Sequence, residues 1–247
     1  MSALPPPPTT LPFPVSVLMP VCNEADVIES TITEWVNDVF AYLPPGSEFL
    51  IDEAASTDGT REILARLCEK YDFLHVTNRD VKDGFGAAAK RLYEAASCPL
   101  VFFTDSDGQY VAAEFWKLAP HAARFDLVHG AKVGRQDTFA RKVASAIFNR
   151  IARFVFDVHY TDINSAFRLG RRDVILSILP STRVMPTLVN AEMLLRMELG
   201  NYAIKQIRVR HRPRRFGVSR GLPPLGFLRE ALRAYRGLLE LKREFKA

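Results

Sequence analysis

The chain has 247 residues, of which 48% are apolar, so it can bury a core of its own and is not an intrinsically disordered chain. Apolar runs such as residues 100–103 are far shorter than the roughly 20 residues of a membrane-spanning helix, so no transmembrane span is expected. The N-terminus lacks a secretory-signal pattern, and Cys22, Cys68 and Cys98 do not have metal-ligand spacing. A cytoplasmic location is therefore expected.

Positive charge is concentrated in the C-terminal part. The net charge is +5, yet thirteen Lys and Arg against three Glu fall from Lys205 onward, so residues 1–204 are acidic overall. The basic tail indicates an anionic partner, either phosphate groups or an anionic membrane surface, with a solvated basic face as the alternative. The pI of about 9.2 suggests a nucleic-acid-binding protein as the non-enzyme alternative, but the acidic balance of residues 1–204 argues against a nucleic-acid partner.

The order of the expected elements predicts an α/β fold. A Pro-rich stretch at residues 1–14 is expected to be a mobile leader. Apolar β-runs at residues 15–19, 48–51, 73–77 and 100–104 alternate with helical patterns at residues 25–42, 58–70 and 85–96. This alternation implies βαβ crossovers and a mainly parallel sheet flanked by helices. The active site should then lie at the carboxyl ends of the strands.

Glycine-rich phosphate-binding motifs are absent from the sequence. Neither G-x-x-x-x-G-K-[ST] nor a G-x-G-x-x-G after the first β-run occurs, which argues against an ATPase and an ordinary dinucleotide-binding enzyme. Gly84, Phe85 and Gly86 are interpreted as a turn into a helix whose small residues permit close packing. Backbone approach to a ligand is the alternative.

Two carboxylates follow the fourth β-run directly. Asp105 and Asp107, with the amide of Gln109, belong to residues 105–109, called the acidic loop from here on. Two like charges about 4 Å apart repel by roughly 4 kcal/mol at an effective dielectric constant near 20, so a cation or a raised pKa is expected. Oxygen ligands of this kind suit Mg²⁺ or Mn²⁺, completed by diphosphate oxygens and water. The alternative is an Asx-type turn that caps the next helix.

An ordered series of motifs then resembles a known family. The motifs are M-P-V-C-N-E at residues 19–24, A-S-T-D-G-T at 55–60, G-F-G-A-A at 84–88, F-F-T-D-S-D-G-Q-Y at 102–110, D-I-N-S-A-F-R at 162–168 and R-R-F-G-V-S at 214–219. The series resembles the family 2 glycosyltransferases, and more narrowly the dolichyl-phosphate mannose synthases and polyprenyl-phosphate glucosyltransferases. The resemblance covers about residues 15–220 and implies a GT-A domain there. It also implies inverting transfer of a hexose from a nucleotide-diphosphate sugar to a polyprenyl phosphate.

The resemblance assigns donor-binding and metal-binding roles residue by residue. Donor contacts are implied for Pro20, Cys22, Glu24, Asp58, Asp105, Lys132 and Arg214, and metal contacts for Asp105, Asp107 and Gln109, with Asp107 also counted as catalytic. Cys22 stands where the family usually has an aromatic residue. The acidic pair that receives the base corresponds either to Glu53 and Ala54 or, with a one-residue bulge, to Asp52 and Glu53.

The acceptor side is expected to be a phosphate site. Arg141 and Ser145 lie four residues apart, so on a helix they share a face and can reach one anion. The resemblance places the acceptor phosphate there, and an ionised phosphate needs positioning more than a general base. A soluble hydroxyl acceptor would need a base, for which Glu192 is the candidate, with a helix-surface carboxylate as the alternative. Asp162, Ser165 and Arg168 match a motif of the active-site floor, and a buried polar network explains them equally well.

A basic amphipathic helix is predicted within residues 221–247. Leu228, Leu232, Tyr235 and Leu239 recur at helical spacing beside Arg229, Arg233 and Arg236. This helix either packs on the catalytic domain or a partner, or lies on anionic lipid at the inner face of the membrane.

Overall fold

The computed structural model describes residues 11–133, 139–213 and 224–245; of residues 139–145 and 224–232 it describes the backbone alone. Its strands are β1 Val15–Val21, β2 Glu48–Ala54, β3 Leu74–Arg79, β4 Leu100–Phe103, β5 Leu127–Val133, β6 Arg168–Arg171 and β7 Ile204–Arg210. Its α-helices are α1 Ile28–Asp38, α2 Thr60–Lys70, α3 Phe85–Ala95, α4 Phe115–Leu118, α5 Phe139–Phe156, α6 Arg172–Ile178, α7 Val189–Leu199 and α8 Pro224–Glu244.

The strands form one seven-stranded sheet in the order β3-β2-β1-β4-β6-β5-β7. The pairs β1–β2, β2–β3, β1–β4 and β5–β7 are parallel, whereas β6 runs antiparallel to both β4 and β5. The expected mainly parallel sheet flanked by helices is therefore confirmed. Because β1, β2 and β4 are parallel neighbours, the loops that follow them meet at one edge of the sheet.

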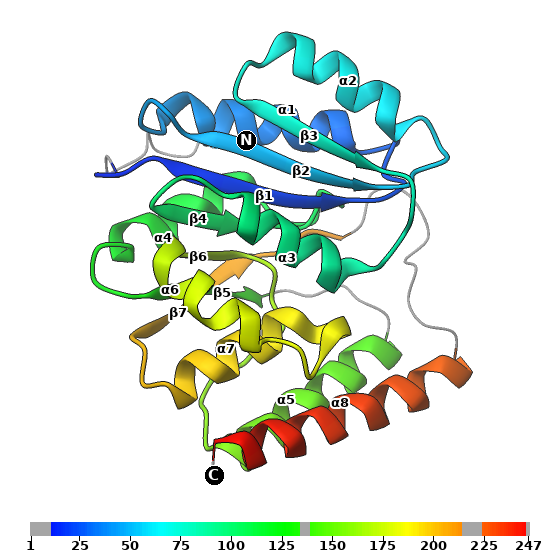
Figure 1. Ribbon diagram of the computed structural model, residues 1–247, viewed down its shortest axis with the longest axis vertical. Coiled ribbons are helices and arrows are strands. Elements are labelled where there is room, and N and C mark those ends of the chain that lie inside the picture. Colours follow the sequence, from blue (N-terminus) through cyan, green and yellow to red (C-terminus); the bar gives the residue numbers. More distant parts are fainter. Residues whose placement is uncertain (1–10, 134–138, 214–223, 246–247) are drawn as a thin grey trace.

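Helices cover both faces of the sheet (Figure 1). The side chains of β4 alternate between these two faces. On one face Phe102 packs against Trp35 of α1, with ring centroids 5.2 Å apart. On the other face Phe103 stacks on Tyr93 of α3 at 5.3 Å. All of these rings are buried, so the strand that precedes the acidic loop is held by aromatic packing from both sides.

Most expected elements differ from the observed ones by one or two residues at an end, and two differences are larger. The helix expected at residues 25–42 is α1 followed by a short 3-10 helix, Phe40–Tyr42. The chain turns there because Phe40 stacks on Phe49 and Phe73, with ring centroids 5.3 and 4.5 Å apart. The strand expected at residues 48–51 continues to Ala54, because the carboxylates within it are neutralised by arginines, as described below.

The C-terminal half of α8 packs on the domain beside α5 (Figure 1). Leu238 and Leu241 are fully buried, whereas Tyr235 of the predicted apolar stripe is 44% exposed. Lys242 donates a hydrogen bond from Nζ to the carbonyl of Val155 at the end of α5, at 2.6 Å. This half of the helix is therefore part of the fold. No helix among the described residues is long and apolar enough to cross a membrane.

A carboxylate clamp joins the strands at their amino ends, opposite the acidic loop. Glu48 accepts hydrogen bonds from the hydroxyl of Ser16 on β1 and from both the backbone N–H and the hydroxyl of Ser97 before β4. Burial raises the pKa of Glu48, but these hydrogen bonds outweigh it and leave the pKa below its ordinary value. The clamp thus holds β1, β2 and β4 in register.

We expect Glu48→Gln to lower the free energy of unfolding by about 1 kcal/mol near neutral pH, because charge-assisted hydrogen bonds are lost. Since the folded-state pKa is depressed, the stabilisation is present above the unfolded pKa of about 4.3 and is lost as pH falls through the folded pKa. Urea unfolding at pH 7 and at lower pH measures it, with the exposed carboxylate variant Glu94→Gln as control. A difference between wild type and Glu48→Gln that does not shrink as the pH falls below about 4 would contradict the clamp.

Candidate active site

The acidic loop leaves the sheet between α1 and a buried polar network around Arg168, which is described below. Thr104 continues the pairing of β4 through a hydrogen bond from its N–H to the carbonyl of Leu18, at 3.0 Å. Asp105 and Asp107, which follow, are half-buried, while Ser106 between them is buried. The two carboxylates therefore sit at the carboxyl edge of the sheet, as predicted.

The Asp105 carboxyl group lies in a field of negative charge. Burial, and then the neighbouring Asp107, raise its pKa to about 7, and Asp162 and Glu24 push it further in the same direction. The ammonium group of Lys132 opposes them. A carboxyl group whose charged form is disfavoured by its surroundings gains most from a cation, so the donor set fits a divalent metal.

The acidic loop also contains the turn expected as the alternative. The backbone N–H of Gln109 donates to Oδ1 of Asp107 at 3.1 Å, and Gly108 has a φ of 68°, which glycine adopts without strain. No side-chain cap starts the following 3-10 helix, Ala112–Glu114, so the turn shapes the loop and does not cap that helix. The Asx turn and the proposed metal site can coexist, because the turn uses one oxygen of Asp107.

A segment after β7 fixes the acidic loop from the far end of the chain. The backbone N–H of Arg212 donates to the carbonyl of Gln109 at 2.7 Å, and the side-chain amide of Gln109 donates to the carbonyl of Arg212 at 3.1 Å. His211 forms an isolated antiparallel bridge with Tyr110. The amide oxygen of Gln109 is thus the atom of this side chain suited to a cation.

A metal site here needs ligands from a substrate. Among the described residues no group of three or more His, Cys, Asp and Glu side chains is arranged to hold a metal ion. Asp105, Asp107 and Gln109 supply three oxygen-bearing side chains, and Mg²⁺ or Mn²⁺ sites of this kind are completed by phosphate oxygens and water.

The loops after β1 and β2 are joined by hydrogen bonds between side chains and backbone. Asn23, with a φ of 53°, receives a hydrogen bond at Oδ1 from the N–H of Thr57 at 2.7 Å, and its own N–H donates to the hydroxyl of Ser56. Asp58 accepts from the N–H of Ala25 at 3.2 Å. The motifs at residues 19–24 and 55–60, far apart in sequence, thus form one wall of the site.

Asp58 takes part in that wall through its own turn. Burial raises its pKa, but hydrogen bonds from Thr60 and Ala25 outweigh this effect and lower it. The N–H of Glu24 donates to the hydroxyl of Thr60 at 2.9 Å. The geometry favours a role for Asp58 in holding the two loops together, and direct contact with the donor stays a prediction.

Both carboxylates assigned to the nucleotide base are paired with arginines. Asp52 receives two hydrogen bonds from Arg91 of α3, at 2.8 and 2.9 Å, and lies 3.5 Å from Arg79. On the other face of β2, Glu53 pairs with Arg61 of α2 at 2.5 Å. Both are buried, at 2% and 0% exposure, and the paired guanidinium groups offset the cost of burying them.

The backbone of β2 is regular through both carboxylates and turns sharply just after the strand. Pro20 pairs with Asp52, and Val21 with Glu53, so both carboxylates belong to the regular strand. Ala55, just beyond, has a φ of 50°, which is strained for a residue other than glycine. Which pair receives the base, Glu53 with Ala54 or Asp52 with Glu53, stays a prediction.

The arginines at this edge were missed by sequence reasoning. Arg61, Arg79 and Arg91 come from three separate elements, and only the fold brings them to Asp52 and Glu53. The one available signal was two acidic residues inside an apolar strand pattern, which require positive partners when buried.

A buried polar network lies beneath the acidic loop. Arg168 donates to the carbonyls of Ser165, Ile163 and Asn190, and desolvation lowers its pKa to about 10. The hydroxyl of Ser165 lies 2.8 Å from that of Tyr110, the residue after the acidic loop. The motif at residues 162–168 therefore forms a buried structural network, and this network also supports the acidic loop from below.

Lys132, at the carboxyl end of β5, is brought to the site. Its Nζ lies 5.5 Å from the centre of the Tyr110 ring, and its backbone N–H donates to Oδ2 of Asp162 at 3.2 Å. Together with its effect on the pKa of Asp105, this places a positive charge beside the acidic loop. Such a charge suits a phosphate group bound there.

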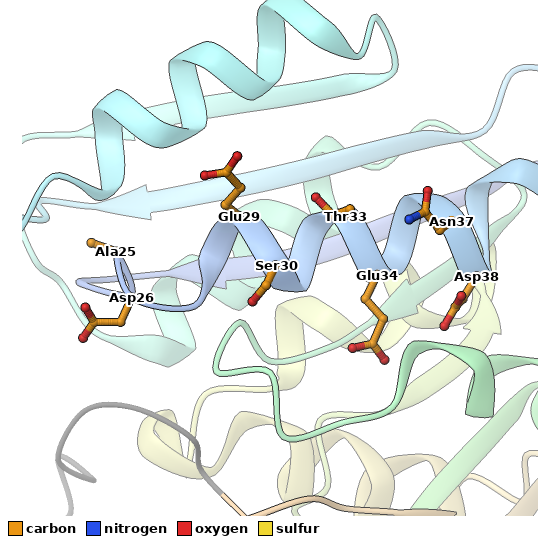
Figure 2. Close-up of a pocket in the computed structure, with 8 residues that line it drawn as sticks. All are labelled: Ala25, Asp26, Glu29, Ser30, Thr33, Glu34, Asn37 and Asp38. Carbon is orange, nitrogen blue, oxygen red and sulfur yellow. The ribbon is translucent and has the colours of Figure 1, made fainter. Parts of the chain in front are cut away.

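An acidic groove runs along the outer side of α1, next to the site. Figure 2 shows Asp26, Ser30, Glu34 and Asp38 projecting to the same side of this helix. The groove measures about 640 Å³, and burial together with Glu34 raises the pKa of Asp38. Because its lining is rich in carboxylates, the groove by itself is unfavourable for an anionic donor.

A smaller cavity of about 180 Å³ lies between α1 and the acidic loop. Asp107, Gly108, Thr31 and Arg212 contribute to its lining, and Arg212 donates to Oε2 of Glu34 at 2.7 Å. The ion pair neutralises one carboxylate and ties α1 to the segment after β7.

The packing around Gly86 bears on the two interpretations of Gly84, Phe85 and Gly86, which are close helix packing and backbone approach to a ligand. A Cβ atom built on Gly86 would lie 2.0 Å from the carbonyl oxygen of Pro186, in the 3-10 helix Pro186–Leu188. This distance is far inside van der Waals contact, so the position requires glycine for close packing of α3. The packing interpretation is supported for this glycine.

Glu192 on α7 is a buried carboxylate. Its Oε1 accepts hydrogen bonds from the N–H groups of Arg183 and Val184, its Oε2 accepts one from Met185, and Arg196 pairs with it at 2.9 Å. It is fully buried, so the helix-surface alternative is wrong. With both oxygens occupied by loop donors, the geometry favours a positioning role, and the general-base role stays a prediction.

Several predicted residues lie at the margins of the described structure. Pro20 is in β1 and Cys22 is half-buried in the loop after it. Arg141 and Ser145 lie on the backbone of α5, but their side chains are outside the described structure, and Arg214 lies outside the described residues altogether.

Curated relatives share the sequence over most of this chain. Glycosyltransferase AglJ of Haloferax volcanii is 29% identical over 175 residues, which is 68% of this chain and 53% of that protein. Undecaprenyl-phosphate 4-deoxy-4-formamido-L-arabinose transferase of Aeromonas hydrophila is 29% identical over 196 residues, 76% of this chain and 59% of that protein. The chain thus spans little more than half the length of these relatives.

Solved structures match the fold. Glucosyl-3-phosphoglycerate synthase of Mycobacterium tuberculosis, in complex with Mn²⁺, UDP-glucose and phosphoglyceric acid, superposes with a TM-score of 0.68 at 19% identity, covering 94% of this chain and 80% of that one. Mannosyl-3-phosphoglycerate synthase of Rubrobacter xylanophilus gives a TM-score of 0.62 at 15% identity, covering 94% and 74%.

The fold of this chain is therefore the GT-A fold that the motif series implied. The model of the family described as glycosyl transferase family 2 matches residues 16–179, which include the motif at residues 19–24, the acidic loop and the network beneath it. This match covers well over half of the chain. The chain belongs to glycosyl transferase family 2.

Proposed function

We propose that this chain transfers a hexose from a nucleoside-diphosphate sugar to a polyprenyl phosphate, with inversion, at the inner face of the cytoplasmic membrane. The observation that carries the proposal is the carboxylate pair Asp105 and Asp107 at the carboxyl edge of the sheet, with Lys132 beside it. Membership of glycosyl transferase family 2 supports the reaction class.

Asp105, Asp107 and Gln109 would hold a Mg²⁺ or Mn²⁺ ion together with the donor diphosphate. The bound ion would supply Lewis-acid stabilisation of the departing nucleoside diphosphate. The chain's own contribution is to keep two carboxylates together in a partly dehydrated loop, which the Asx turn and the Arg212 contacts hold in shape.

The wall formed by the loops after β1 and β2 would receive the nucleoside. Asp52 and Glu53 are held by their arginines at the edge of this wall. Pro20, Cys22 and Glu24 complete the proposed donor site on the β1 side. Cys22 offers a smaller surface to a base than the aromatic residue usual in the family.

A phosphate acceptor matches the chemistry of the other side of the site. One of the relatives is named as a transferase acting with undecaprenyl phosphate, which supports a lipid phosphate acceptor here. α5 starts six residues after β5 ends and carries Arg141 and Ser145 in its first two turns. An ionised phosphate oxygen would attack the anomeric carbon, and the nucleoside diphosphate would leave from the opposite face of the sugar, so no proton need be removed.

We expect Asp107→Asn to lower kcat by at least about a hundredfold, since a ligand charge is lost without a change in side-chain volume. Transfer from a radiolabelled nucleoside-diphosphate sugar at saturating Mn²⁺ measures this, and the exposed variant Asp72→Asn serves as control. Circular dichroism establishes that both variants are folded. Retention of most of the turnover by Asp107→Asn would contradict the metal role.

Arg141→Ala is expected to raise the KM for a short-chain prenyl phosphate about tenfold or more, while the donor KM changes little, because a charge-assisted contact to phosphate is lost. Initial rates with each substrate varied in turn measure the two constants. Arg124→Ala, at another exposed arginine, is the matched control. Equal increases in both KM values would move Arg141 out of the acceptor site.

Glu192→Gln separates a loop anchor from a general base. As an anchor, Glu192 holds three backbone N–H groups, so the variant should lose about 2 to 3 kcal/mol of unfolding free energy and keep most of its kcat well below Tm. Thermal unfolding and turnover on the same preparation measure both. A variant with unchanged Tm and turnover reduced a hundredfold would instead establish the base and favour a soluble hydroxyl acceptor.

A further inference from the structure

The outward face of α5 carries large apolar side chains next to arginines. Phe154 is 89% exposed and Ile147 is 54% exposed. Arg150, also exposed, lies between them at spacings of three and four residues, so all three share one side of the helix. Arg153 is exposed beside Phe154. Isolated exposed apolar residues are ordinary, but two of this size on one helical face, with cations interleaved, form an amphipathic surface.

The orientation of this face is fixed by packing on the opposite side of α5. Asn149 and Ala152 are buried, and the side-chain amide oxygen of Asn149 accepts a hydrogen bond from the N–H of Ile163 at 3.1 Å. At the end of the helix, Lys242 of α8 donates to the carbonyl of Val155. Ile147 and Phe154 therefore cannot turn inward without breaking these contacts.

The neighbouring helix α8 adds charge to this end of the molecule, and its C-terminal half packs on the domain beside α5. Leu238 and Leu241 are buried, and a Cβ atom on Gly237 would clash with Cγ of Met185 at 2.4 Å, so α8 approaches Met185 closely at this glycine. Arg236 is exposed. Among the described side chains of α5 and α8, the two most exposed apolar ones, Phe154 and Ile147, are both on α5.

We propose that the outward face of α5 docks the protein on an anionic lipid bilayer, with Ile147 and Phe154 entering the interfacial region and Arg150 and Arg153 contacting lipid phosphates. This inference deepens the proposed function, because it rests on a lipid acceptor. Charge favours the bilayer as the occupant, since a second copy of the chain on this face would bring the arginines of two subunits together. One carboxylate, Asp157, follows at the end of the helix and is outnumbered by the arginines.

The position of α5 connects the bilayer to the site. The helix has 18 residues and starts at Phe139, just beyond the β5 end that carries Lys132. At 1.5 Å per residue it spans about 27 Å. Figure 1 shows it running with α8 along the end of the molecule remote from β1, β2 and β3. A membrane against this helix would hold a lipid whose phosphate reaches the start of α5 while its chain stays among other lipids.

Vesicle flotation with the full-length chain tests the docking. Binding to vesicles of phosphatidylcholine with about one third phosphatidylglycerol should exceed binding to phosphatidylcholine alone and should fall as salt rises. The double variant Ile147→Ser with Phe154→Ser should reduce the partition constant about tenfold or more, and Arg150→Glu about fivefold or more. The matched controls Phe13→Ser and Arg66→Glu, exposed residues elsewhere, should bind as wild type does.

A depth reporter provides an independent readout. The chain has two Trp residues, and Trp35 is buried, so a new Trp at the surface can be followed by difference. Phe154→Trp should show a blue-shifted emission when the anionic vesicles are added, whereas Phe13→Trp should not. Circular dichroism and Tm values of the variants verify that a loss of binding is not a loss of fold.

Two outcomes would overturn the inference. The first is vesicle binding of the folded double variant equal to wild type, together with no emission shift of Phe154→Trp. The second is sedimentation velocity that shows a dimer broken by the double variant, which would assign the face to a second copy. Transfer to a short-chain, water-soluble prenyl phosphate without vesicles separates this result from the proposed function. If the vesicle-binding prediction fails but the variants still transfer sugar to the soluble prenyl phosphate, the docking inference is wrong and the proposed function stands. If the vesicle-binding prediction holds but wild type does not transfer sugar to the soluble prenyl phosphate, the proposed acceptor is wrong.

Discussion

The main physical constraint on the site is the negative charge of Asp105 and Asp107 at the end of the buried strand β4. β4 is packed by aromatic rings on both faces, so the strand end from which Asp105 and Asp107 follow is held in place. Burial and mutual repulsion raise the pKa of Asp105 to about 7. Positive charge nearby stabilises the two ionised carboxylates, and Lys132 supplies only part of the positive charge that they need. A divalent ion with a diphosphate is the ligand class that meets this demand without leaving an excess of positive charge.

Other carboxylates at this edge of the sheet are paired with arginines, so these arginines do not neutralise the acidic loop. Asp52 and Glu53 are neutralised by Arg91 and Arg61, and Glu34 by Arg212. Among the described residues, no arginine forms an ion pair with Asp105 or Asp107 of the acidic loop. The structural carboxylates and the proposed metal ligands thus differ in their partners and not in their residue type.

The sequence predicted the fold well because alternating apolar runs and helical patterns report directly on a parallel sheet, and the acidic loop because its residues are adjacent in the chain. Contacts between side chains far apart in the sequence could not be predicted. No local pattern links Arg91 to Asp52, or Glu192 to the backbone of residues 183–185, and so Glu192 suggested a base where the structure has an anchored carboxylate. In α8, Tyr235 of the predicted apolar stripe is exposed while Leu238 outside it is buried, because helical spacing alone does not say which face meets the domain.

The most direct test of the account is thermal unfolding of the full-length chain with a panel of nucleoside diphosphates, each with and without Mn²⁺. If the acidic loop binds a metal and a diphosphate together, one nucleoside diphosphate at about a hundred times its dissociation constant should contribute about 2.7 kcal/mol, or roughly 5 °C or more in Tm, only when Mn²⁺ is present. Equal stabilisation with and without the metal, or none from any nucleotide, would contradict the claim that these carboxylates form a metal-dependent donor site.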